Sequence, residues 1–312
     1  MKPIGGYFGL ETGVGCLPPA SAIPVNFGRG GLEVILCSRG YRHVYLPDYL
    51  CPDVFAFLKA IAMPYTTYGI DAELEPVAIP KLDRDEAFLY VNYFGVKDAY
   101  CLCLEQSQPN LILDLSQAFH YRPRRADGFN SARKFFGVPD GAFVFGKDLT
   151  DVALPESHSF DQCEALLRRA DGDLAGGYAA FHRLEQAKGG QRAAKMSLLT
   201  RSLLGSIDVN RAQAARLKNF LTLHQLLGHA NVLAVDTDVA GPLCYPFLDS
   251  NGALLKQRLI EKHVFVPTYW RGLDAYTSPN ALVDAWARNL VCLPCDQRYS
   301  PSDMAAIAKI IS

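Results

Sequence analysis

The sequence predicts an α/β protein with a mainly parallel sheet, helices on both faces of that sheet, and a smaller α+β domain at the carboxyl end. Strand-like apolar runs alternate with segments of helical apolar spacing in the first half of the chain. These runs are almost continuously apolar, which is typical of strands buried on both faces. The pattern becomes helical from about residue 160 and returns to short mixed elements after residue 228.

The first half contains four strand-like segments and two helix-like segments between them. An apolar run bounded by turn residues favours a strand, whereas apolar residues three or four apart favour a helix. The strands are expected at residues 41–48, 87–95, 110–116 and 141–146, and the helices at 31–40 and 51–62.

The second half begins with long helical patterns and ends in a mixed region. Helices are expected at 163–170, 178–204, 210–228, 253–263 and 300–312, with strands within 232–252 and at 264–270. The last helix has a capping box from Ser300 to Asp303 and a proline, Pro301, at its first position. We therefore predict a large domain over 1–175, connecting helices over 176–228 and a small domain over 229–312.

Composition narrows the class of protein. The chain has 312 residues, a formal net charge of −1 and nine cysteines. This charge argues against bulk attraction to nucleic acid or anionic membranes. The first residues resemble no signal peptide, and no apolar run approaches the roughly 20 residues that span a bilayer. An odd number of cysteines in apolar contexts indicates reduced thiols, and therefore a cytoplasmic protein.

The pair Cys292-x-x-Cys295 has a spacing seen in zinc sites, but no second pair lies near it. Packing in the core is the favoured interpretation of these two cysteines, and we expect no metal.

Three short stretches contain residues suited to chemistry. Gly28, Gly30 and Gly31 precede a helical pattern, so open main-chain amides there would bind a phosphate, to which Arg29 would add a charged donor. Glycines also open helices merely to form a turn, and this alternative stays open.

Asp114 follows an apolar strand, where ligands of open α/β sheets bind. Its carboxylate would pair with a buried cationic nitrogen, or alternatively cap a helix. Lys134 lies among Arg133, Phe135 and Phe136, and desolvation or a neighbouring cation would prepare its amine to attack a carbonyl group. A solvated lysine is the alternative.

The order of these stretches resembles that of fold-type I pyridoxal-phosphate (PLP) enzymes, and more narrowly of the DegT/StrS-type sugar aminotransferases. The resemblance covers about residues 25–145 and resumes more faintly over the carboxy-terminal third. The matching stretches are FGRGGLEVIL, VYLPDYLCPDVFAFLKAIAMPYTTYGID, YVNYFGVKD, LDLSQAF and SARKFFGVPDGAFVF, followed by RLKNF and LPCDQRYSPSDM.

The resemblance implies a role for each matching residue. Lys134 would bind PLP as an internal aldimine and later transfer the proton, and Asp114 would keep the pyridine nitrogen protonated. Gln117 would contact the ring or its phenolic oxygen. The phosphate would be bound by Arg29, Gly30 and Ser131. The family often has an aromatic residue where this chain has Cys51, so Tyr49 is expected to cover the cofactor face instead.

The resemblance also implies a large domain with a sheet of the seven-stranded type, a homodimer and a keto-sugar substrate linked to a nucleotide. Glutamate would donate the amine, and the product would enter cell-envelope or secondary-metabolite glycans. Lys134 favours transamination, because the related sugar dehydratases have histidine at that position.

Two departures from the family motivate other functions. The stretch before the phosphate loop is short, and the Asn-x-Arg loop of the partner subunit has no clear counterpart, although Ser197 or Arg201 would substitute for it. The alternatives are a non-catalytic binding or scaffold subunit and a PLP enzyme with a different reaction.

Three further features of the sequence have two interpretations each. The basic segment 121–128 is more consistent with a solvated loop than with a nucleotide clamp. His120 is expected to be a hydrogen-bonded, partly buried residue rather than an acid. Trp270 would line a substrate pocket or belong to the core.

Overall fold

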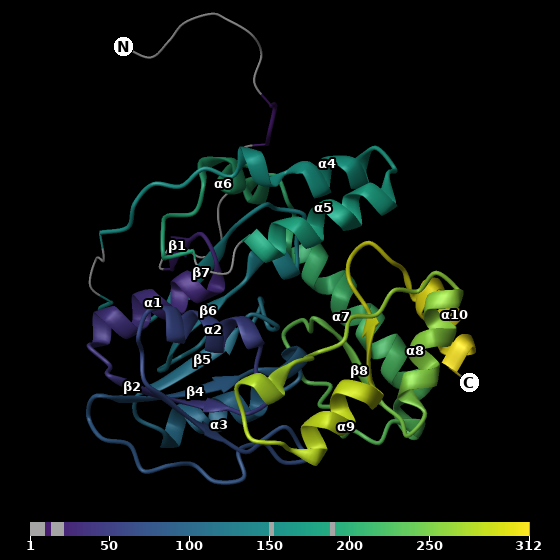
Figure 1. Ribbon diagram of the computed structural model, residues 1–312. Coiled ribbons are helices and arrows are strands. Elements are labelled where there is room, and N and C mark those ends of the chain that lie inside the picture. The colour runs from purple at the N-terminus through teal and green to yellow at the C-terminus, as the bar shows by residue number, and fades with distance from the viewer. Residues whose placement is uncertain (1–9, 14–21, 150–152, 188–190, 312) are drawn as a thin grey trace, which may run out of the picture.

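The computed structural model describes residues 10–13, 22–149, 153–187 and 191–311. Its main body is a seven-stranded sheet in the order β1-β7-β6-β5-β4-β2-β3, with helices on both faces (Figure 1). Cys16, one of the nine cysteines, lies outside the described residues.

The central part of the sheet is parallel. Strands β3, β2, β4, β5 and β6 pair in parallel, whereas β7 pairs antiparallel with both β6 and β1. The carboxyl ends of the parallel strands therefore meet at one edge of the sheet. The strands are β1 (Ile23–Val25), β2 (His43–Pro47), β3 (Tyr65–Tyr68), β4 (Glu86–Val91), β5 (Leu111–Leu115), β6 (Asp127–Asn130) and β7 (Ala142–Phe145).

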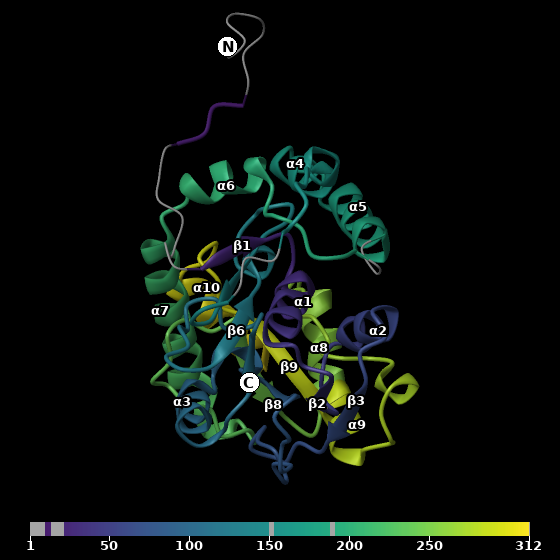
Figure 2. The ribbon, with the colours of Figure 1, turned by 90° about the vertical axis from the view of Figure 1, so that its left-hand side faces the viewer.

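Helices cover the two faces of this sheet. In Figure 2, α1 and α2 lie on one side, and α3 and α7 lie on the other. Gly31 allows the close approach of α1, because a Cβ atom there would lie 2.9 Å from the Cβ of Phe129 on β6. The bounds are α1 (Gly28–Arg39), α2 (Pro52–Ala60), α3 (Asp98–Ser107) and α7 (Val209–Leu227).

Three further helices form a layer beyond the β1 edge of the sheet (Figure 1): α4 (Glu164–Ala170), α5 (Leu174–Ala187) and α6 (Leu198–Gly205). Helices α4 and α5 pack as an antiparallel hairpin at the top of Figure 1. Helix α6 begins with a side-chain cap, in which the Ser197 hydroxyl oxygen accepts a hydrogen bond from the Thr200 amide at 3.1 Å.

The carboxy-terminal part contains a two-stranded antiparallel sheet covered by helices. Its elements are β8 (Cys244–Leu248), α8 (Gly252–Glu261), α9 (Ala281–Asn289), β9 (Leu290–Pro294) and α10 (Pro301–Ile311). Trp286 of α9 is almost fully buried. The predicted α/β class with a smaller α+β part is confirmed, whereas the domain boundaries at residues 175 and 228 stay predictions.

Most of the predicted elements are present, and the last helix has the predicted capping box. The Ser300 amide donates to Asp303 Oδ2 at 2.8 Å. The single helix predicted over 178–204 is wrong: α5 ends at Ala187, and the chain bridges to β1 at Lys195 before α6 begins. There the Lys195 amide donates to the Pro155 carbonyl at 2.9 Å, which replaces helical bonding.

The strand predicted at 264–270 is also wrong. Pro267 has no amide to contribute to a ladder, and the Tyr269 carbonyl accepts a hydrogen bond from the Tyr49 hydroxyl at 2.6 Å. This segment is therefore bonded to the large domain by a side chain. Helix α9, which the sequence did not predict, follows it.

No helix within the described ranges is long and apolar enough to cross a membrane. The eight cysteines that the structure describes are free thiols, and the same part of the chain contains no group of three or more His, Cys, Asp or Glu side chains suited to hold a metal ion.

Candidate active site

The predicted site residues gather at the carboxyl ends of the parallel strands. Asp114 lies on β5, paired in register with Val91 of β4 on one side and Phe129 of β6 on the other. Lys134 ends a single 3₁₀ turn, Ala132–Lys134, that directly follows β6 and Ser131. The sheet therefore brings the carboxylate and the amine to the same edge, where ligands of such sheets bind.

Asp114 is a buried carboxylate, 5% exposed, close to an ammonium group. Burial raises the pKa of Asp114, while the positive charge of Lys134 and hydrogen bonds from Ser116 lower it. The Ser116 amide donates to Asp114 Oδ1 at 2.8 Å. Lys134 itself is an exposed residue. The predicted pair Asp114 and Lys134 is thus brought together.

Gln117 presents an unpaired donor in this region. Its Oε1 accepts from the Phe94 amide at 2.7 Å. Because that amide can only donate, the orientation of the Gln117 side chain is fixed, and its Nε2 faces away from Phe94. Gln117 is 1% exposed, and its Nε2 has no hydrogen-bond partner. A buried donor without a protein partner is uncommon, and this one is available to donate to the acceptor of a bound molecule.

Phe94 is held in an unusual conformation beside Gln117. Its φ of 57° lies in the left-handed region, which non-glycine residues seldom adopt. The Phe94 carbonyl accepts from the Leu243 amide at 2.8 Å, so both main-chain groups of Phe94 are bonded. Gly95 follows with φ 74°, and a Cβ atom there would lie 2.7 Å from the Gln117 carbonyl oxygen. Backbone strain of this kind is concentrated at functional sites.

The amino-terminal end of α1 faces the same region. A Cβ atom on Gly28 would lie 3.2 Å from both the Asn130 carbonyl oxygen and Ser116 Oγ. The N-cap residue, Phe27, provides no side-chain cap for the helix. The first-turn amides and the helix dipole therefore favour an anion at this end of α1.

Arg29, Gly30 and Ser131 lie around this helix start in different ways. The Arg29 guanidinium forms an ion pair with Asp53 of α2 at 3.0 Å. Gly30 permits a close approach, because a Cβ atom would lie 2.5 Å from Asn26 Oδ1. Ser131 is half-buried directly after β6. Of these residues only Ser131 directly follows β6, and the phosphate contacts of all three stay predictions.

Tyr49, expected to cover the cofactor face, is completely buried at the contact with the carboxy-terminal part. Its ring stacks on Tyr93 with centroids 5.5 Å apart and lies 4.9 Å from Trp286. Cys51 lies closer to the reactive groups: burial raises the pKa of its thiol, Lys134 lowers it, and Asp53 and Asp114 raise it. Tyr49 was expected at the cofactor face because a thiol offers no aromatic surface.

His120 does not fit the hydrogen-bonded histidine that was expected. It is buried against Phe119 and Phe135, with ring centroids 5.4 and 5.8 Å away, and its Nε2 has no hydrogen-bond partner. Burial, followed by Arg216 and Arg122, lowers the pKa of His120 to about 3. His120 is therefore a neutral packing residue.

Segment 121–128 is fixed mainly through its backbone. Glu105 accepts hydrogen bonds from the amides of Arg124 and Arg125, each at 2.6 Å, while both of these side chains are exposed. This is consistent with the predicted solvated loop.

Two other residues singled out in the sequence have structural contacts. Ser197 hydrogen-bonds Asp140 at the start of α6, and Trp270 packs edge-on against Tyr49 with centroids 5.0 Å apart.

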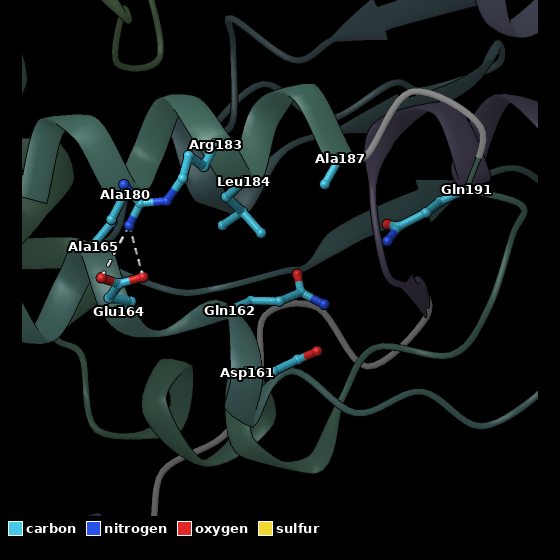
Figure 3. Close-up of a pocket in the computed structure, with 9 residues that line it drawn as sticks. All are labelled: Asp161, Gln162, Glu164, Ala165, Ala180, Arg183, Leu184, Ala187 and Gln191. Atoms are coloured by element: carbon cyan, nitrogen blue, oxygen red, sulfur yellow. Dashed lines mark hydrogen bonds and ion pairs between the residues drawn. The ribbon is translucent and has the colours of Figure 1, made fainter.

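A separate cavity of about 310 Å³ lies between α4, α5 and the segment after α5 (Figure 3). An ion pair between Arg183 and Glu164, 3.1 Å long, spans one wall. Its lining contains none of the predicted site residues and consists of Asp161, Gln162, Glu164, Ala165, Ala180, Arg183, Leu184, Ala187 and Gln191. This cavity is therefore distinct from the candidate active site.

The fold is shared with solved aminotransferases. DesV of S. venezuelae in complex with a ketimine intermediate superposes with a TM-score of 0.63, at 16% identity over 93% of this chain and 83% of DesV. A DegT DnrJ EryC1 StrS aminotransferase from Brucella abortus gives a TM-score of 0.61, at 14% identity over 93% of this chain and 84% of that chain.

DesI, solved in the presence of its TDP-sugar product, also gives a TM-score of 0.61, at 17% identity over 93% of this chain and 79% of DesI. The chain has the fold of these aminotransferases. The predicted fold-type I architecture is thereby confirmed. No family model and no curated protein matches the sequence, so the similarity is one of structure.

Proposed function

We propose that this protein is a PLP-dependent aminotransferase that transfers an amino group from glutamate to a keto-sugar carried by a nucleotide. The observation that supports it most is the pairing of buried Asp114 with Lys134, beside a Gln117 Nε2 that has no partner. An aromatic cofactor with a ring nitrogen, an aldehyde and a phosphate has groups suited to each of these features.

The residues present fit PLP. Asp114 would pair with the ring nitrogen, which supplies the positive charge that a buried carboxylate needs. Gln117 Nε2 would donate to the phenolic oxygen and thereby gain its missing acceptor. The amides at the start of α1, together with Arg29, Gly30 and Ser131, would bind the phosphate. Cys51 or Tyr49 would lie against the ring.

The cofactor, when bound, supplies an electron sink for the carbon that loses its proton. Lys134 Nζ is the group that would bind the aldehyde carbon and afterwards accept and return the proton as a general base. The positive charge of Lys134 favours the ionised form of its neighbour Asp114, against the effect of burial. Burial of Phe94, Gln117 and Asp114 limits the access of water to these groups.

The finer assignments rest on the resemblance and on the neighbours. DesI was solved with a TDP-sugar product and DesV with a ketimine intermediate, which supports a sugar substrate and amine transfer for this fold. We further propose a cytoplasmic homodimer whose product enters cell-envelope or secondary-metabolite glycans, and a PLP-binding large domain over 1–175.

Absorbance spectroscopy tests the proposal. Addition of PLP to purified protein should produce a visible band that is lost in Lys134→Ala and kept in Lys218→Ala, a matched control on the exposed face of α7. Glutamate should remove the band, and a nucleotide-linked keto-sugar should restore it. No band in the wild type contradicts PLP binding. A band that glutamate leaves unchanged contradicts this amine donor.

A further inference from the structure

Arg216 of α7 is a deeply buried cation whose hydrogen-bond partners are carbonyl oxygens. It is 2% exposed, and burial lowers the pKa of its guanidinium. Within the described ranges no carboxylate forms an ion pair with it. A buried charge without such a partner is costly, and an apolar side chain of similar volume would often be more stable. The position of Arg216 therefore requires an explanation beyond packing.

The guanidinium contacts the loop that carries Lys134. Its Nη2 donates to the Phe135 carbonyl at 3.3 Å, and its centre lies 4.5 Å from the Phe135 ring centroid. The same carbonyl accepts a second bond from Gln297 Nε2 at 2.7 Å. Two side chains from the carboxy-terminal third thus hold the residue next to Lys134.

The second terminal nitrogen of the Arg216 guanidinium, Nη1, contacts the segment Pro242–Leu243, which supports Gln117 through Phe94. It donates to the carbonyls of Pro242 and Leu243 at 3.3 and 3.2 Å. The Leu243 amide donates to the Phe94 carbonyl at 2.8 Å. The Phe94 amide in turn orients Gln117 through the 2.7 Å bond to Oε1. A continuous series of contacts therefore joins Arg216 to both Phe135 and Gln117.

We propose that Arg216 is a positioning residue that fixes Lys134 and Gln117 relative to each other, with Gln297 as a second support of the lysine loop. This inference rests on the proposed function, because only a shared ligand makes the relative position of Lys134 and Gln117 important. In the described part of the chain Arg216 forms no hydrogen bond with Lys134 or Gln117. It acts through the Phe135 carbonyl on one side and through Leu243 and Phe94 on the other.

Amide hydrogen exchange of the protein without cofactor tests the proposal. Arg216→Met should increase exchange both in the peptide around Phe135 and Phe136 and in the peptide around Phe94. Gln297→Leu should increase it only around Phe135, because that variant keeps the contact of Arg216 with Leu243. Arg298→Met is the matched control: Arg298 pairs with Asp296 at 2.7 Å and does not bond the lysine loop. It should leave both peptides unchanged.

A titration with PLP provides the second measurement. Arg216→Met should weaken PLP binding about tenfold, Gln297→Leu should weaken it less, and Arg216→Lys, which keeps one donor group, should restore part of the affinity. If Arg216→Met does not fold, Gln297→Leu and Arg216→Lys still test both sides.

Exchange that is unchanged at both peptides, or raised evenly over the whole chain, would overturn the positioning role. If the wild type forms no visible band with PLP, the proposed function fails, whereas the exchange pattern still decides whether Arg216 joins the two segments.

Discussion

The sheet edge around Asp114 and the α4–α5 hairpin differ in which side chains they bury. Polar side chains are buried at the sheet edge, whereas large apolar side chains are exposed on the hairpin. At the sheet edge, Asp114 and Gln117 are buried at 5% and 1% exposure. On the hairpin, Leu174, Tyr178 and Phe181 follow one another at helical spacing and are 58%, 67% and 43% exposed. Buried polar groups without full partners indicate chemistry, whereas the solvent-facing stripe of α5 contributes little to the core.

The way each region is attached differs as well. Strands β4, β5 and β6 are joined by a continuous parallel ladder, and the Phe94 amide after β4 donates to Gln117 after β5. In the hairpin, α4 has no buried residue and α5 buries only Gly177 and Ala180. An ion pair of 2.5 Å between Arg133 and Glu185 links α5 to the lysine loop. We therefore expect most of the folding free energy to reside in the sheet region.

The sharpest test of this difference compares two phenylalanines. Phe119 is completely buried after β5, and Phe181 is half-exposed on α5. Phe119→Ala should lower the free energy of unfolding by about 3–5 kcal/mol, whereas Phe181→Ala should change it by roughly 0.5 kcal/mol or less. Urea denaturation measures both. Equal effects would show that the hairpin is as tightly packed as the sheet.

The pH dependence of stability provides the next largest expected effect. The pKa of His120 is lowered from 6.5 to about 3, so the unfolded chain binds a proton below pH 6.5 that the folded chain binds only near pH 3. Stability is thus lost as the pH falls through this window, by about 3 kcal/mol at pH 4. His120→Gln should remove most of that loss, whereas His229→Gln, an exposed control, should retain it. Identical acid profiles for all three proteins would contradict a buried neutral His120.

Asp114 tests the electrostatics of the site itself. Its pKa is raised by burial, so the folded chain holds the proton to a higher pH than the unfolded chain does, and stability falls as the pH rises through that window. Asp114→Asn should remove this dependence and weaken PLP binding by about 2 kcal/mol, roughly 30-fold. An absorbance titration measures the affinity. Unchanged affinity would exclude Asp114 from the cofactor contact.

The smallest effect is expected at the link between the two regions. Arg133→Gln removes the ion pair with Glu185. The side chains of Arg133 and Glu185 are 17% and 38% exposed. It should destabilise the protein by about 1 kcal/mol or less and increase proteolysis within α5. The control Lys195→Gln, which breaks the exposed ion pair with Glu156 outside the hairpin, should leave the α5 cleavage rate unchanged. A large global loss after Arg133→Gln would show that the hairpin is part of the main folding unit.

The fold could be predicted further than the site. Continuous apolar runs gave β2, β4, β5 and β7, because burial on both faces leaves a clear pattern. The short strand β1 was not predicted, and the segment 264–270 was wrongly predicted as a strand, because long-range partners decide their structure: Lys195 bridges to β1, and the Tyr49 hydroxyl bonds the Tyr269 carbonyl. The local sequence does not determine these contacts between distant residues.

Asp114, Gln117 and Lys134 were predicted as site residues from their order along the chain, and their roles stay predictions. The contacts that surround these three residues could not be predicted from that order. The bond from Phe94 that orients Gln117 depends on a left-handed backbone at a non-glycine residue, and the Arg216 contacts join residues about 80 positions apart. The choice between Tyr49 and Cys51 depended on side-chain direction, which the spacing of Pro47–Cys51 does not determine.

A peptide map of the protein after incubation with PLP and reduction by borohydride tests the central claim most directly. We expect the cofactor mass on the peptide that carries Lys134, at one equivalent per chain, with a strongly reduced yield in Asp114→Asn. Label distributed over exposed lysines such as Lys218, or absent from Lys134, would contradict the account.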